Sequence, residues 1–101
     1  MNVLKAISVI DSLREGWYIP PTNYNKKRKD FDKMSFQRTA MDEIRFYLMG
    51  HASENPIDTI EKFRRMMDDF SCRSKSGDTS FMFSVYYDVA TDVLDVLLGM
   101  K

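Results

Sequence analysis

The sequence is poor in the residues that most catalytic and metal sites require. Among 101 residues it has one cysteine, Cys72, and one histidine, His51. A single cysteine cannot form an internal disulfide or the paired-cysteine motif of a zinc site, and it indicates a reducing environment. No glycine-rich phosphate loop, nucleophile elbow or cysteine-protease signature is present. These absences argue against an enzyme, and we expect no catalytic residue, metal or cofactor.

Long uninterrupted hydrophobic runs are also missing. The most apolar stretch, residues 81–100, contains Asp88, Asp92 and Asp95, which a membrane-spanning helix tolerates poorly. The N-terminus lacks the basic segment, apolar run and cleavage site of a secretory signal peptide. The sequence therefore predicts a cytoplasmic protein with no membrane partner.

The composition nevertheless provides enough apolar material for a folded core. Hydrophobic residues make up 44% of the chain and aromatic residues 13%, and a chain of this length predicts one domain spanning residues 1–101. The net charge is zero, but residues 1–50 carry nine Lys/Arg against six Asp/Glu, and residues 51–101 carry six against nine. This polarity fits matching within the protein or between copies as readily as an outside partner.

Four segments show apolar residues at three- and four-residue spacing, which predicts helices over about 2–15, 35–49, 56–72 and 78–98. Asn55 is expected to cap the third helix, with Pro56 in the first position, where its missing N–H costs nothing. We therefore predict an all-α, small four-helix bundle with a long basic loop between helix 1 and helix 2. The residues expected to face the core are Val3, Ile7, Ile10 and Leu13; Phe36, Ala40, Ile44, Tyr47 and Leu48; Ile57, Ile60, Phe63, Met67 and Phe70; and Met82, Val85, Tyr86, Val89, Val93, Val96 and Leu97.

The predicted loop, residues 18–33, is the most unusual segment, because sixteen residues are many for a connection in a compact domain. Its cations could neutralise phosphates while its aromatic neighbours stack on unpaired bases. The other interpretation is a solubilising loop whose charges are balanced by Asp30 and Asp32. The candidate binding residues are Lys26, Lys27, Arg28, Lys29, Tyr24 and Trp17.

Three aspartates of the last helix, Asp88, Asp92 and Asp95, share one face and are called the acidic ladder below. Adjacent carboxylates about 6 Å apart repel by roughly 0.7 kcal/mol in bulk water. A solvated face could carry this repulsion, or a basic surface could match it, with Arg64–Arg65 or the loop lysines as candidates. A metal is disfavoured, because one helix spreads three oxygens along about 10 Å.

Aromatic residues outside the main apolar stripes indicate an interface. Phe46 and Phe83 flank the stripes of their helices, and eight methionines add adaptable apolar surface. The sequence thus predicts a small non-enzymatic protein-interaction module, with self-association through the surface around Phe46 and Phe83. A protein partner or homodimer is expected, and no small-molecule substrate is indicated. The alternative is a nucleic-acid-binding accessory protein that uses residues 26–29.

Overall fold

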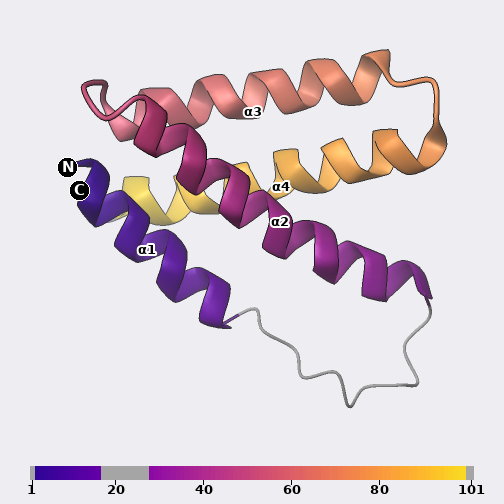
Figure 1. The fold of residues 1–101 in the computed structure, drawn as a ribbon, viewed down its shortest axis with the longest axis horizontal. Coiled ribbons are helices and arrows are strands. Elements are labelled where there is room, and N and C mark those ends of the chain that lie inside the picture. The colour runs from indigo at the N-terminus through magenta and orange to yellow at the C-terminus, as the bar shows by residue number, and fades with distance from the viewer. Residues whose placement is uncertain (1, 17–27, 100–101) are drawn as a thin grey trace.

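Four α-helices make up the part of the chain that the structure describes (Figure 1). The computed structural model describes residues 2–16 and 28–99, and the side chains of residues 2–15 and 33–99. The helices are α1 (Val3–Gly16), α2 (Arg28–Gly50), α3 (Pro56–Arg73) and α4 (Gly77–Gly99). Within those two ranges there is no strand, which confirms the predicted all-α class.

Two helix starts follow directly from the local sequence. The Asn2 side-chain oxygen accepts a hydrogen bond from the Lys5 backbone N–H at 2.8 Å. The Asn55 side-chain oxygen accepts one from the Ile57 backbone N–H at 2.9 Å, with Pro56 at the start of α3 as predicted. These bonds satisfy N–H groups that have no partner inside the helix.

The start of α2 differs from the prediction by seven residues. We expected a helix from Ser35, whereas α2 begins at Arg28, so residues 28–33 belong to a helix and not to the loop. Residues 28–34 lack the apolar periodicity that locates a helix, but they also contain neither glycine nor proline, which break helices. The remaining expected loop residues, including Tyr24, Lys26 and Lys27, lie outside the described residues, as does Trp17 just before the loop.

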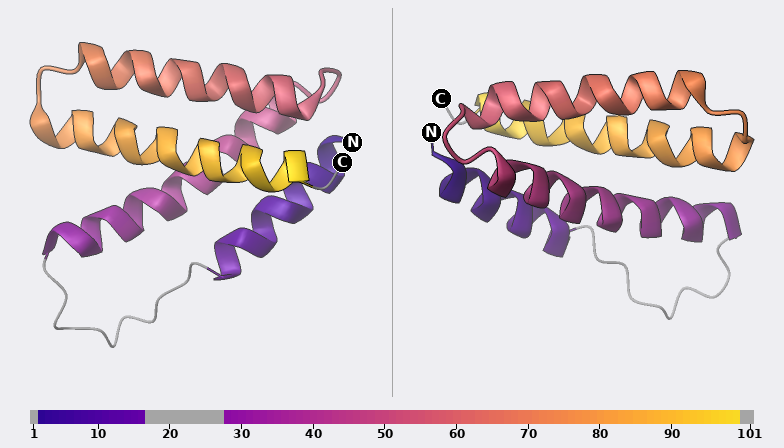
Figure 2. Two further views of the ribbon diagram at one scale, coloured as in Figure 1. Left: turned by 180° about the vertical axis from the view of Figure 1, so that it is seen from behind. Right: turned by 45° about the horizontal axis from the view of Figure 1, so that its top comes forward.

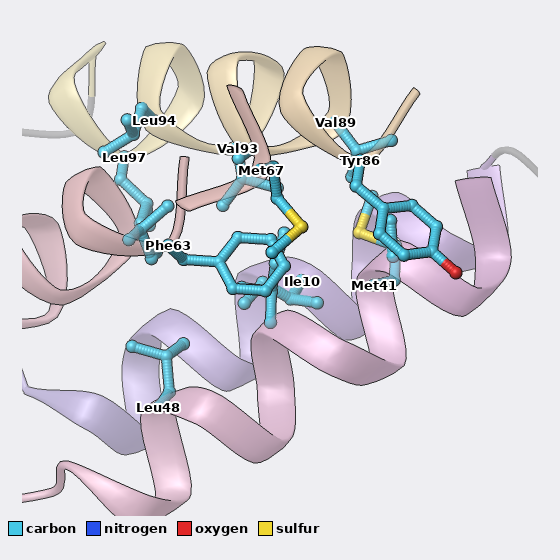
Figure 3. Packing of buried hydrophobic residues seen from close by; sticks show 14 of the residues in the cluster. Ile10, Met41, Leu48, Phe63, Met67, Tyr86, Val89, Val93, Leu94 and Leu97 are labelled. Carbon is cyan, nitrogen blue, oxygen red and sulfur yellow. The ribbon is translucent and has the colours of Figure 1, made fainter. Parts of the chain in front are cut away.

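The helices form two layers, with α3 and α4 antiparallel in one and α1 and α2 antiparallel in the other (Figure 2). Side chains from all four helices point into one interior between the layers (Figure 3). Ile10, Ile44, Leu48, Ile60 and Leu97 are almost completely buried there. The predicted stripes therefore locate the centre of the core.

For two residues at the edges of their stripes, the predicted burial is wrong. Phe70 and Val96 were expected inside but are 43% and 37% exposed. Each follows a buried residue by three positions, which rotates it about 60° towards the edge of its stripe. Conversely, Ala6 and Leu94 are buried although they were not assigned to a stripe. Among the helices of the described ranges, none is both long and apolar enough to cross a membrane.

Candidate functional site

Most of the exposed large apolar side chains gather at one end of the bundle. We call this the terminal end, because α1 begins and α2 and α4 end there (Figure 1). Of the six such side chains in the described residues, Phe70 alone lies towards the other end, late in α3. The other five belong to the first turn of α1 or to the last turns of α2 and α4: Leu4, Phe46, Met49, Val96 and Leu98.

An apolar groove of about 520 Å³ lies between the start of α1 and the end of α2. Leu4 on its α1 side is 78% exposed, and Met49 on its α2 side is 56% exposed. We call it the α1/α2 groove; its lining residues are Asn2, Val3, Leu4, Ile7, Arg45, Met49 and Ala52. A groove of this size and character can hold apolar side chains of a partner.

Two ion pairs join α1 and α2, the helices that form the walls of the groove. The two terminal guanidinium nitrogens of Arg14 contact the two carboxylate oxygens of Asp42, at 3.1 and 3.2 Å, which joins α1 to α2. Nearer to the groove, Arg45 lies 3.8 Å from Asp11, and both of these side chains are 47% exposed. A bidentate guanidinium–carboxylate contact sets geometry better than a single long one. The groove is therefore anchored on its inner side and open at the terminal end.

The structure separates the two aromatic residues that the sequence linked to an interface. Phe46 is 69% exposed on α2, next to Met49, since residues three apart are neighbours on a helix surface. Phe83 is half-buried on α4, with its ring 5.3 Å from Phe70 and 6.1 Å from Tyr86. It lies near the start of α4, away from the terminal end. The surface around Phe46 is thus the apolar surface that merits a functional interpretation.

Two residues of the acidic ladder, Asp88 and Asp92, line a second, polar hollow of about 300 Å³ between α2 and α4. Thr91 lies beside them on α4, and Lys33 and Gln37 line the hollow from α2. No ion pair to a ladder carboxylate is found in the described part of the chain. Of the candidate matches, Lys33 lines this hollow without an ion pair to the ladder, and Arg64 lies over the Tyr87 ring at 5.6 Å.

Partial burial and the neighbouring carboxylates both disfavour the charge of Asp92 in the ladder. Burial raises the pKa of Asp92 above its usual value, and the charges of Asp88 and Asp95 raise it further. A matching basic surface would lower that pKa. Among the described residues, the three ladder carboxylates do not form a group that could hold a metal ion.

The basic run extends over the beginning of α2. Arg28 and Lys29 are the first two residues of that helix, while Lys26 and Lys27 lie outside the described residues, as do Tyr24 and Trp17. Nucleic-acid binding by these residues stays a prediction.

The cysteine and the histidine are far apart. His51 follows α2 and donates from Nδ1 to the Tyr47 carbonyl at 2.8 Å, whereas Cys72 is exposed near the end of α3. His51 lies in the turn that precedes α3, and about 24 Å of helix separates the start of α3 from Cys72. A catalytic Cys–His pair is therefore not formed.

No family model matches the chain, and neither the curated proteins nor the solved structures yield a significant match. The site must therefore be interpreted from its own geometry. Sequence reasoning identified Phe46 and included Met49 among the methionines of an adaptable surface, but it missed Leu4. The available signal for Leu4 was its position in the first helix outside the stripe formed by Val3, Ile7, Ile10 and Leu13.

Proposed function

We propose that this protein is a non-enzymatic interaction module that binds a protein partner through its terminal end. The interaction surface consists of the α1/α2 groove together with Phe46. The observation that carries the proposal is the concentration of exposed large apolar side chains at this one end of the bundle. Apolar patches of a few hundred Å² on a soluble fold commonly mark interaction sites.

The chemistry of the surface supports recognition of another protein. Leu4, Phe46 and Met49 combine two flexible aliphatic side chains with one aromatic ring, and each is more than half exposed. Methionine adapts to irregular partner surfaces, and aromatic side chains contribute strongly at interface centres. Arg45 at the edge of the groove adds a cation that can orient the partner.

Photo-crosslinking in cells that express the chain tests this proposal. Benzoylphenylalanine placed at position 49 is expected to give protein adducts at several-fold higher yield than the same residue at position 75. Lys75 is exposed in the connection between α3 and α4, away from the terminal end, so it provides the matched control. Gel shifts and mass spectrometry of the adducts measure both yields. Equal yields at the two positions would contradict the proposal.

A further inference from the structure

We propose that the partner of the terminal end is a second copy of this chain. In this two-fold dimer, Phe46 of each copy inserts into the α1/α2 groove of the other copy. The inference rests on the proposed function, because it assigns an occupant to the same surface.

A projecting aromatic side chain and an apolar groove lie next to each other on this surface. Phe46 is 69% exposed and has no ring contact with another described residue. Met49, its neighbour one helical turn later, lines the groove. The groove of about 520 Å³ is open to solvent and mostly apolar, so a benzyl group of a second copy can pack against it between α1 and α2. The chain thus presents both halves of one apolar contact.

The adjacency of the two halves favours a closed dimer. When the projection and the groove share one surface, a rotation by 180° places each Phe46 over the groove of the other copy. Such an isologous contact is complete with two copies, whereas complementary features on opposite sides of a molecule lead to open chains. The position of Phe46 beside Met49 therefore points to two-fold symmetry.

The exposed apolar area sets the expected strength of the dimer. If a fully exposed side chain of this size presents about 200 Å², then Leu4, Phe46 and Met49 at their observed exposures present roughly 400 Å². A stable interface of standard size buries about 800 Å² per partner. The apolar centre supplies about half of that area, and the polar rim must supply the rest. We therefore expect a dimer that forms reversibly with rising concentration.

The charges at the rim suit a second copy. Arg45 and Asp11 stand beside the groove, half exposed and only loosely paired at 3.8 Å, and Lys5 is exposed on α1. A rim with both signs can match itself across a two-fold axis, because each cation can meet a carboxylate of the other copy. A rim of one sign would repel the second copy.

Sedimentation velocity over a concentration series from roughly 5 to 200 µM tests the dimer. The mean mass of the wild type should rise from 11.9 kDa towards twice that value. Phe46→Ser should weaken association about thirty-fold or more, the effect expected for a central aromatic residue. Phe70→Ser makes the same chemical change at an exposed phenylalanine away from the terminal end and should associate like the wild type. Circular dichroism of both variants is used to check that they remain helical.

Two results would overturn the inference. The first is a wild-type mass that stays at 11.9 kDa over the whole series. The second is Phe46→Ser protein that associates as strongly as the wild type.

A mixing experiment tests the reciprocal insertion itself. Phe46→Ser keeps the groove but lacks the projection, while Leu4→Glu keeps the projection but places a charge in the groove. Position 4 lies in the first turn of α1, where an acidic residue is compatible with the helix dipole. Each variant alone should be monomeric, whereas a mixture should form a heterodimer with one intact contact. A mixture that stays monomeric, beside a dimeric wild type, would overturn the reciprocal arrangement.

The two proposals fail in distinguishable ways. A monomeric wild type combined with adducts of other proteins at position 49 overturns the dimer and supports the proposed function. A monomeric wild type with equal adduct yields at positions 49 and 75 overturns both proposals.

Discussion

Replacement of Phe63 by alanine is expected to lower the free energy of unfolding by about 3 to 5 kcal/mol. Phe63 is 4% exposed and points from α3 into the space between the layers, where its ring lies 5.7 Å from that of Tyr47 (Figure 3). The substitution removes buried apolar surface and leaves a cavity that helices on both sides line. For a domain of this size, 1 kcal/mol corresponds to roughly 4 to 8 °C in Tm. Urea denaturation followed by circular dichroism measures the loss.

Phe46→Ala is the matched control for this prediction. It deletes the same ring from a site that is 69% exposed, so we expect a change of at most about 0.5 kcal/mol in the monomer. The comparison must be made at low concentration, where association does not add to stability. Similar losses for the two variants would contradict the assignment of Phe63 to the core and Phe46 to the surface.

The helices could be predicted from the sequence where local patterns determine them. The apolar spacing within α3, together with Asn55 and Pro56 at its start, specifies both its face and its first turn. The first seven residues of α2 could not be located in this way, because residues 28–34 have no apolar stripe and a helix propagates through them from the packed part that follows. Phe70 was misassigned because spacing alone does not show how much of a stripe's edge the neighbouring helices cover.

The groove could not be predicted from the sequence, because it is a property of two helices. Its walls contain Leu4 and Met49, which are forty-five positions apart in the chain. The contact between Arg14 and Asp42 that aligns these walls also joins residues twenty-eight positions apart. Nothing in the local sequence at either position encodes such a pairing. Phe46 could be identified because an aromatic residue outside a helical stripe is a local signal.

Replacement of Asp88, Asp92 and Asp95 together by asparagine is expected to raise the free energy of unfolding at pH 7 by about 1 to 2 kcal/mol at low salt. The substitution removes like-charge pairs at spacings of four and three, and it removes Asp95 from near the negative end of the α4 dipole. The gain should shrink in high salt, because exposed charges are screened. Had a basic surface matched the ladder, the same change would lower the melting temperature.

The pH dependence of this gain follows from the raised pKa of Asp92. Because the folded protein holds the Asp92 proton more tightly than the unfolded chain does, acidification neutralises Asp92 in the folded wild type first, which relieves both its desolvation and its repulsion. The gain in the free energy of unfolding of the triple variant should therefore reach its full value above the folded-state pKa of Asp92. It should fade as the pH falls through that value towards the unfolded pKa, which thermal melts across a pH series can measure.

Asp78→Asn provides a control of opposite sign on the same helix. Asp78 lies in the first turn of α4, where a negative charge is favourable, so its loss should lower stability by about 0.3 to 1 kcal/mol. A triple variant that melts below the wild type at pH 7 would contradict repulsion as the dominant effect and would point to a cation that neutralises the ladder. A stabilised triple variant beside a destabilised Asp78→Asn protein would show that position along the helix determines the effect of each charge. The ladder would then be a solvated face that reduces stability, and the terminal end would remain the surface at which we propose that a partner binds.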